Sequence, residues 1–357
     1  MKNSRILIII TEIDATRIAV YQNTNMLFLK TVRHKEHELN PLHTIDEQIE
    51  YRMKIVLEEL SNADIRTDLI NAIISRGGLL KPISAGIYEI NDAMIHDLRH
   101  GEKWHEVNLG SLIADKLTQV FKGSIAYTAD PVVVDEMDDV ARFTGLPQFK
   151  RKSIFHALNH KAQARKYAKA VMKKYEDINL IVGHLGDGIS IGAHRKGSVV
   201  DVNQTLDGGG AFSLERAGSL PEGDLVSMCF SGKYTENEIL ELIKNDGGMK
   251  AYVGTSDLHD IEYMIADGNK LASEVFEAMG YQVAKYIGSM AAVLNGDVDA
   301  IILTGNIAYN QQFTNYVIEK IKFIAPVVVY PGECLAEALS NKVLGLMSGE
   351  LQLKEYV

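Results

Sequence analysis

The sequence predicts an α/β protein built from two related domains with mixed sheets and a central cleft. The chain of 357 residues is too long for one ordinary hydrophobic core. Apolar runs of strand length alternate along it with segments of helical spacing. The order strand, loop, strand, turn, strand occurs twice, in residues 5–32 and again in residues 180–203. We therefore expect domains at 1–150 and 151–357, with a closing helix at 335–350 able to pack back on the first.

The first copy of this layout consists of the runs "RILIII", "RIAVY" and "MLFLKTV". Thr44 is the expected N-cap of the next helix, because apolar residues keep helical spacing from Ile45 to Leu60. A buried-type strand, "LINAIIS", then opens into Arg76-Gly77-Gly78, and a second helix is expected near 111–121. The strand in "SIAYTADPVVVDE" is expected to end in a loop at Pro131.

The second copy follows a predicted helix over 153–175, for which Ser153 is the expected cap. It reads "LIVGH", "ISIGAH" and "SVVDVN", with the loop "LGDG" after the first run and a Lys196-Gly197 turn before the third. A long helix in "LASEVFEAMGYQVAKYIGSMAAVLNG" then leads into the strand "AIILTG". A further strand in "FIAPVVVYPGE" and a closing helix in "CLAEALSNKVLGLMS" complete the pattern.

Composition narrows the functional classes. A hydrophobic content of 46% and a charged content of 24% are typical of a folded globular protein. A net charge of −10 argues against nucleic-acid binding, which needs a basic surface. Cys229 and Cys334 give no disulfide framework, and the N-terminal apolar run is too short for a signal peptide or a membrane span. We therefore expect a cytoplasmic protein that binds neither nucleic acid nor membrane.

Three glycine-bearing loops follow apolar strands: "HLGDG" at 184–188, "DGGG" at 207–210 and "TGN" at 304–306. Backbone N–H groups without neighbouring Cβ atoms can converge on one phosphate. Any one such loop is more often a plain turn, but three of them together favour a nucleotide site. Their spacing matches neither the P-loop nor the dinucleotide fingerprint, which argues against a nicotinamide enzyme.

Charged side chains stand next to these loops and strand ends. Arg76 in "SRGGLL" and Arg216 in "FSLERAG" could each clamp a carboxylate or phosphate, or form a structural ion pair. Asp130 in "TADP" and Glu333 in "YPGE" could hold magnesium with phosphate oxygens, although each in isolation is more often a cap.

The histidines are less specific. His156 and His160 are four residues apart on a predicted helix, but no acidic partner supports a shared metal. His156 is better suited to donate to a transferring phosphoryl group, and His105 says little by itself. The basic residues of the same helix, Lys161 among them, are expected to form a solvated face.

Seven segments together resemble the butyrate kinases of the acetokinase family, a group related to the sugar kinases and actin. They are "SRGGLLKPISAGIYEIND", "TADPVVVDE", "IFHALN", "HLGDGISIGAHRKGSVVDVN", "LDGGGAFSLERAGSLP", "AIILTG" and "APVVVYPGE". The resemblance runs in order from about residue 6 to about residue 350. It implies two duplicated domains of the actin and ribonuclease-H type that close on ATP and a short-chain carboxylate, usually in a dimer or larger homo-oligomer.

The resemblance also implies roles for individual residues. Arg76 and Arg216 would hold the carboxylate and the phosphoryl group, and His156 would stabilise its equatorial oxygens. Asp130 and Glu333 would organise Mg²⁺, and His105 would lie near the carboxylate. The implied nucleotide-binding residues are His184, Gly186, Asp187, Gly188, Asp207, Gly208, Gly209, Gly305 and Asn306. These roles agree with phosphoryl transfer, which asks mainly for positioning and charge neutralisation.

The sequence departs from this family pattern at its first phosphate loop. Where the family carries N-P-G-S-T-S-T-K, residues 10–17 read "ITEIDATR". Glu12 and Asp14 would bring two negative charges near a phosphate, and Ile13 resists the positive φ of a glycine turn. Asp187, Asn306 and Gly209 also replace the usual residues. Two hypotheses remain open: a carboxylate kinase, and a catalytically impaired homologue that binds a ligand or a partner.

Overall fold

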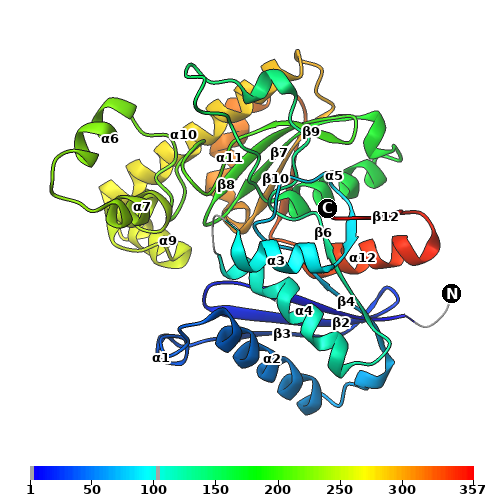
Figure 1. The fold of residues 1–357 in the computed structure, drawn as a ribbon. Coiled ribbons are helices and arrows are strands. Elements are labelled where there is room, and N and C mark those ends of the chain that lie inside the picture. The colour runs from blue at the N-terminus through cyan, green and yellow to red at the C-terminus, as the bar shows by residue number, and fades with distance from the viewer. Residues whose placement is uncertain (1–3, 102–104) are drawn as a thin grey trace. The chain divides into compact units, whose positions relative to one another are not determined.

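The computed structural model describes residues 4–101 and 105–357 (Figure 1). Contacts divide the chain into two units. The N-terminal unit comprises Met1–Val134 with Cys334–Val357, and the C-terminal unit comprises Asp135–Glu333. Among the described helices, none has the length and apolarity needed to span a bilayer.

The N-terminal unit contains a seven-stranded mixed sheet. Strands β1 (Arg5–Thr11), β2 (Ala15–Gln22) and β3 (Asn25–Arg33) form an antiparallel meander. On the other side of β1, strands β4 (Ile70–Ser75) and β6 (Ile125–Ala129) run parallel to it. Two short strands, β5 (Ile87–Glu89) and β12 (Leu353–Lys354), complete the order β12-β5-β6-β4-β1-β2-β3.

The C-terminal unit repeats this arrangement in a five-stranded sheet. Strands β7 (Asn179–Leu185), β8 (Ile189–Arg195) and β9 (Ser198–Val202) form the meander. Strands β10 (Ala300–Gly305) and β11 (Val327–Pro331) run parallel to β7, giving the order β11-β10-β7-β8-β9. This order and these directions equal β6-β4-β1-β2-β3. The internal duplication and the α/β class with two mixed sheets are therefore confirmed.

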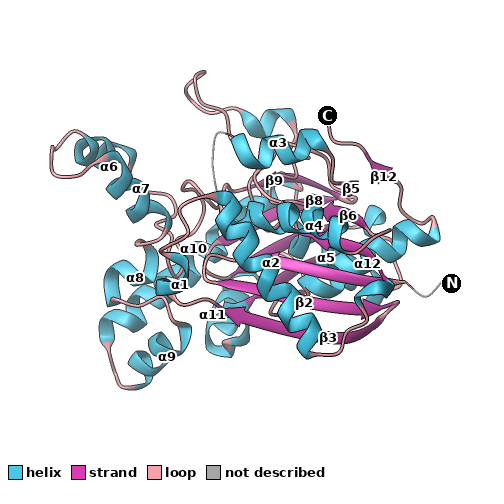
Figure 2. Ribbon diagram, turned by 60° about the horizontal axis from the view of Figure 1, so that its bottom comes forward, coloured by secondary structure: helices cyan, strands magenta, loops and turns pink. Residues whose placement is uncertain are grey.

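Helices cover the N-terminal sheet (Figure 2). Helices α2 (Ile45–Asn62) and α4 (Leu109–Val120) share a core with Leu7 and Ile9 of β1. Helix α12 (Leu335–Ser348) also packs on β1 and β4, so the closing helix belongs to the N-terminal unit. The short helices α1 (Glu36–Leu39) and α3 (Asp92–His100) complete this unit. Thr44 caps α2 as predicted, because its hydroxyl accepts the Glu47 N–H.

Side chains of the C-terminal sheet alternate between two helical layers. Leu180 and Val182 of β7 pack toward α5 (Ala157–Ala170), whereas Ile181 and Leu185 pack toward α10 and its neighbours. The helices of the second layer, and those attached to it, are α6 (Glu222–Cys229), α7 (Glu236–Lys244), α8 (Gly248–Val253), α9 (Leu258–Ala266), α10 (Lys270–Val293) and α11 (Gln311–Ile321). By the same alternation, His184 lies on the α5 face of the sheet.

The helix predicted over 153–175 is shorter than expected at both ends. It begins after His156, not after Ser153, because the Thr205 N–H and hydroxyl both donate to Ile154 O and hold that segment extended. It ends at Ala170, and the chain then turns at Met172, whose φ is 55°. The expectation of Ser153 as the cap is therefore wrong.

Residues 135–152 pack with the C-terminal unit. The Asp138 N–H donates to Val200 O, and Arg151 forms a 2.8 Å ion pair with Asp201. These bonds connect the segment to β9 and explain why the C-terminal unit begins at Asp135.

Candidate functional site

In the N-terminal unit, the parallel strands β1, β4 and β6 end at one edge of the sheet. Thr11 ends β1, Arg76 follows β4 and Asp130 follows β6, and strand carboxyl ends of this kind are where α/β proteins bind ligands. Arg76 Nη2 donates to Thr11 O at 3.1 Å. Gly78, the second glycine after Arg76, leaves space that another segment of the protein fills, since a Cβ on Gly78 would lie 2.8 Å from Asn108 Cα.

Asp130 is buried and already carries a cation. Its Oδ1 accepts the Gly86 N–H at 2.8 Å, and its Oδ2 lies 2.6 Å from Lys342 Nζ of α12. The residue is 1% exposed and has a φ of 41°, which is uncommon for a non-glycine residue. A metal at this carboxylate would have to share it with Lys342 or displace that ammonium.

His105 is placed next to the end of β1 through its neighbour. Its Nδ1 accepts the Val107 N–H at 3.1 Å, and Thr11 Oγ1 donates to Glu106 O at 2.8 Å. Arg76 and His105 are thus both connected to Thr11, Arg76 directly and His105 through the adjacent residue. The structure brings these two predicted substrate residues to one edge of the unit.

The altered loop at 10–17 forms a tight turn held by a buried arginine. Arg52 of α2 is 0% exposed, and its guanidinium donates to Ala15 O at 2.7 Å, to Ile13 O at 2.8 Å and to Thr16 Oγ1 at 3.0 Å. Ile13 does not adopt a positive φ, so this turn does not need the glycine that the family pattern carries. Sequence reasoning missed Arg52, which lies on the same buried face of α2 as Ile49 and Val56, because an arginine is usually assigned to solvent by residue type.

The acidic residues of this turn have cationic partners. Glu12 Oε1 lies 3.2 Å from Arg17 Nη2, and Asp14 Oδ2 lies 3.4 Å from Arg33 Nη1. Together with Arg52 behind the turn, these arginines offset the negative charge that was expected to repel a phosphate. The electrostatic argument for an impaired loop is therefore weaker than the sequence alone indicated.

His34 next to this turn predicts a pH-dependent stability. Its Nε2 lies 2.8 Å from Thr16 Oγ1, and burial, followed by the nearby Arg52 charge, lowers its pKa from 6.5 to about 4. The unfolded chain therefore binds this proton first, so the His34 contribution is present above pH 6.5 and is lost as the pH falls toward 4. Between pH 6.5 and 4, the wild type should lose about 3 kcal/mol of its unfolding free energy through His34. His34→Asn should not show this part of the loss. Urea denaturation at several pH values measures it.

The exposed His37 provides the control. His37→Asn should leave the part of the pH dependence that comes from His34 in place. An equal pH dependence in the wild type and in His34→Asn would contradict the assignment to His34.

In the C-terminal unit, three predicted residues form one cluster. His184, near the end of β7, stacks on His156 with ring centroids 3.7 Å apart and an interplanar angle of 13°. Its Nε2 lies 3.2 Å from Glu333 Oε1, beyond the end of β11. Asn159 Nδ2 lies 2.8 Å from His184 Nδ1 and 3.3 Å from Thr304 Oγ1. Sequence reasoning missed Asn159, whose position three residues after His156 places it on the same helix face.

Arg216 covers the glycine loop at 186–188. A Cβ on Gly188 would lie 2.7 Å from Arg216 Cζ, and a Cβ on Gly186 would lie 3.0 Å from His184 Nε2. Arg216 Nη1 donates to Thr205 O at 2.6 Å, and burial lowers the pKa of its guanidinium while Asp187 and Glu215 raise it. The loop therefore lacks side chains at least in part because Arg216 and His184 occupy that space. The exposed Asp187 is held through its main-chain oxygen, which accepts from Ser213.

The glycine loop at 207–210 is held by several polar contacts. Gly208, Gly209 and Gly210 all have positive φ values, of 91°, 148° and 84°. Asn203 ties this loop to β8, since its Nδ2 donates to Gly209 O at 3.1 Å and to Ile189 O at 2.9 Å. Asp207 Oδ1 lies 3.5 Å from Lys244 Nζ.

Gly305 ends β10 beside the loop of β7. Its φ is 90°, and a Cβ there would lie 2.7 Å from the Leu185 carbonyl carbon. Asn306 follows it, exposed, as the first residue of the 3-10 helix Asn306–Tyr309.

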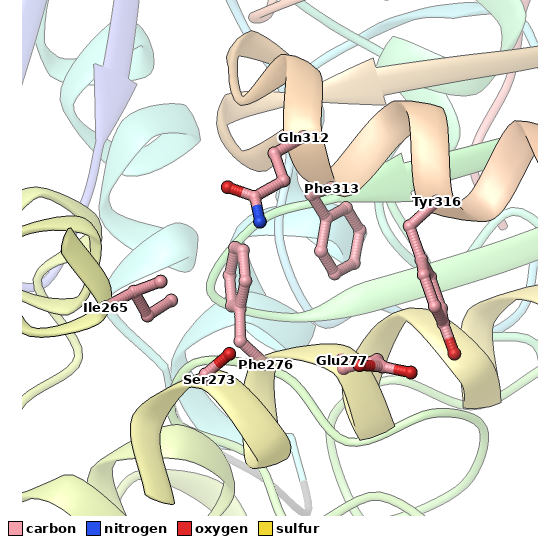
Figure 3. Close-up of a pocket in the computed structure, with 7 residues that line it drawn as sticks. All are labelled: Ile265, Ser273, Phe276, Glu277, Gln312, Phe313 and Tyr316. Carbon is pink, nitrogen blue, oxygen red and sulfur yellow. The ribbon is translucent and has the colours of Figure 1, made fainter. Parts of the chain in front are cut away.

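A small hollow lies elsewhere in the same unit. It is lined by Ile265, Ser273, Phe276, Glu277, Gln312, Phe313 and Tyr316, from α9, α10 and α11 (Figure 3). None of the predicted site residues lines it. Helices α10 and α11 share the core on the sheet face opposite to α5, so the hollow and the histidine cluster lie on different faces.

The described residues contain no group of three or more His, Cys, Asp or Glu arranged to hold a metal. His156 and His160 do not converge on one, since both rings approach the hydroxyl of Ser190. Lys161 is not solvated as expected: it is 1% exposed, and its Nζ lies 2.7 Å from Glu136 Oε2.

Comparisons with known proteins agree with this architecture. Residues 148–328 match the model of the family described as Acetokinase family. Butyrate kinase 2 of Clostridium acetobutylicum is 50% identical over 343 residues, which is 96% of each chain. Butyrate kinase 1 of the same organism is 47% identical over 353 residues, which is 99% of each chain.

Solved structures show the same fold. An acetate kinase from Porphyromonas gingivalis superposes with a TM-score of 0.77 at 19% identity, covering 95% of this chain and 99% of that one. A propionate kinase from Francisella tularensis gives a TM-score of 0.76 at 16% identity, covering 95% and 98%. At these identities the likeness establishes the fold alone.

Proposed function

Because the chain belongs to the acetokinase family, and is therefore a kinase, we propose that it transfers a phosphoryl group reversibly between ATP and a short-chain carboxylate. The substrate would be butanoate or a related branched acid, and the product an acyl phosphate. The observation that carries this proposal is the 50% identity to butyrate kinase 2 over 96% of both chains. Neither the comparisons nor the described residues support the alternative of an impaired homologue.

The proposed phosphoryl site lies in the C-terminal unit. Arg216 and the N–H groups of loop 186–188 would neutralise the charge of the phosphoryl group in flight, with His184 beside them. His156 would donate to an equatorial oxygen. The loops with Asp207, Gly208 and Gly209, and with Gly305 and Asn306, would border the adenosine. In the N-terminal unit, Arg76 and His105 would bind the carboxylate substrate.

We propose that Mg²⁺ binds together with the nucleotide and is held mainly by its phosphate oxygens. Mg²⁺ keeps several waters and takes one or two carboxylates together with phosphate oxygens. Asp130 and Glu333 are the proposed carboxylates, and their present partners are Lys342 and His184. When bound, the ion would neutralise phosphate charge.

We also propose that the enzyme is cytoplasmic and assembles as a homo-oligomer, a dimer or larger. Its two cysteines, Cys229 and Cys334, are unpaired, which suits a reducing compartment. Its proposed ligands are a nucleotide and a small carboxylate.

The test is hydroxamate formation from butanoate, ATP, magnesium and hydroxylamine, run beside a functional butyrate kinase. We expect a rate near that of the control enzyme and a rise in melting temperature on adding ATP. Absence of both hydroxamate and thermal shift would overturn the kinase assignment for these substrates.

Gly188→Ala tests the contact between loop 186–188 and Arg216. The new Cβ would lie 2.7 Å from Arg216 Cζ and push the guanidinium out of place. Since misplacement by about 1 Å can cost 10²-fold in rate, we expect kcat to fall by roughly 10- to 100-fold. Gly288→Ala on α10 is the matched control, because no atom beyond its own stretch of helix lies within 4 Å of its added Cβ. If Gly188→Ala keeps kcat within twofold of the wild type, Arg216 does not depend on this glycine.

A further inference from the structure

A chain of buried polar side chains continues from His156 across the α5 face of the C-terminal sheet. Ser190 Oγ lies 2.9 Å from His156 Nδ1 and 2.8 Å from His160 Nε2. His160 Nδ1 lies 3.3 Å from His194 Nε2, and His194 Nδ1 lies 2.7 Å from the Tyr175 hydroxyl. We call Ser190, His160, His194 and Tyr175 the histidine chain. Its members are at most 3% exposed.

Strand and helix periodicity build this chain. Ser190, Gly192 and His194 are alternate residues of β8 and share the face covered by α5. Gly192 between them leaves space for the His160 ring, since a Cβ there would lie 3.3 Å from His160 Nδ1. His156 and His160 are one helical turn apart, so both reach Ser190 from the same side.

The two inner histidines are neutral. Burial holds the pKa of His160 well below its ordinary value, and the neighbouring His184 and Lys161 lower it further. Burial likewise lowers the pKa of His194, together with His160 and the cations Lys161 and Arg165. Each of these rings therefore carries one proton and has one donor nitrogen and one acceptor nitrogen.

The direction of the hydrogen bonds follows from Tyr175. A phenol O–H is a strong donor and its oxygen is a weak acceptor, so His194 Nδ1 accepts from the Tyr175 hydroxyl at 2.7 Å. The neutral His194 ring then carries its proton on Nε2 and donates to His160 Nδ1. His160 in turn carries its proton on Nε2 and donates to Ser190 Oγ. Every donor in the chain therefore points toward Ser190.

We propose that Ser190, His160 and His194 are positioning residues that hold His156 in the tautomer protonated on Nε2. Ser190 Oγ accepts from His160 and donates its own proton to His156 Nδ1, so the proton of the His156 ring resides on Nε2. His184 is held in the same form, because Asn159 donates to its Nδ1. The use of the His156 Nε2–H toward a phosphoryl oxygen rests on the proposed function, whereas the tautomer itself does not.

The test combines nitrogen NMR of the histidine rings with steady-state kinetics. In ¹⁵N-histidine-labelled protein, we expect His156 to show a protonated Nε2 and an unprotonated Nδ1, with its signals assigned by their loss in His156→Asn. Ser190→Ala should introduce the second tautomer and lower kcat about tenfold, with KM for ATP and for butanoate within twofold. Ser190→Thr, which keeps the hydroxyl, should restore both readouts.

Ser289→Ala is the matched control, since this exposed serine only donates to Tyr286 O within α10. A wild-type His156 protonated on Nδ1 would overturn the inference, and so would a Ser190→Ala protein with unchanged tautomer and kcat. The nitrogen spectrum of the wild type shows which nitrogen of His156 is protonated, so it tests the inference even if Ser190→Ala does not fold. An inactive wild type with the expected tautomer would refute the proposed function and leave this inference standing.

Discussion

Replacing Arg216 with alanine is expected to lower kcat by roughly 10³- to 10⁵-fold, the range in which arginines act on phosphoryl transition states. Arg216 lies against Gly188 of loop 186–188, and it is preorganised by its bond to Thr205 O at 2.6 Å. Arg216 is partly buried, so water screens its charge and donors less than at an exposed surface. Hydroxamate kinetics with ATP and butanoate measure the change.

Three companion measurements sharpen this prediction. Arg216→Lys keeps the charge but loses the planar fork, so most of the rate loss should remain. Added guanidinium should restore part of the activity of Arg216→Ala. Introducing Gly188→Ala into the Arg216→Ala protein should lower kcat only slightly further. Arg195→Ala is the control, because its partner Asp138 lies 2.8 Å away in a partly exposed ion pair. Arg216→Ala with kcat within tenfold of the wild type would contradict the assigned role.

The fold was predictable because its signals are local and periodic. The repeated meander could be recognised from alternating apolar runs, and the structure confirms it because five strands of the first sheet have the same order as the five of the second. The ends of parallel strands also pointed to Arg76 and Asp130, since topology alone brings such residues to one edge.

Buried charges were not predictable in the same way. Arg52 and Lys161 lie at helix positions that face the core, but arginine and lysine are usually assigned to solvent by residue type; both are at most 1% exposed. Their burial depends on acceptors supplied by distant segments, such as Ala15 O for Arg52 and Glu136 for Lys161. The helix start failed for the same reason, because Thr205, remote in sequence, holds Ile154 extended.

The histidine cluster shows what spacing can and cannot reveal. The separation of His156 and His160 indicated one helix face and raised the question of a metal. The structure gives them a shared partner, Ser190, because β8 runs beneath that face. A pairing of helix periodicity with strand periodicity could have suggested this contact, but only once the two elements were known to be neighbours.

Arg52→Met is expected to lower the free energy of unfolding by about 2–4 kcal/mol. The substitution keeps most of the side-chain volume but removes the guanidinium donors of Ala15 O and Thr16 Oγ1 in a buried turn, where only the Glu12 N–H and the His34 ring remain as their partners. Urea denaturation near neutral pH measures the change. Arg66→Met is the control, because its ion pair with Asp68 is exposed and such pairs contribute at most about 1 kcal/mol. A loss below about 1 kcal/mol for Arg52→Met would show that water satisfies these acceptors.

The same variant has a second readout at His34. Burial is the main cause of the lowered His34 pKa, and the Arg52 charge is the next. Removing that charge should therefore raise the His34 pKa from about 4 toward 6.5 without restoring it fully. NMR titration of the His34 ring detects this shift. An unchanged His34 pKa would mean that Arg52 holds the turn through hydrogen bonds alone, with no electrostatic influence on its neighbour.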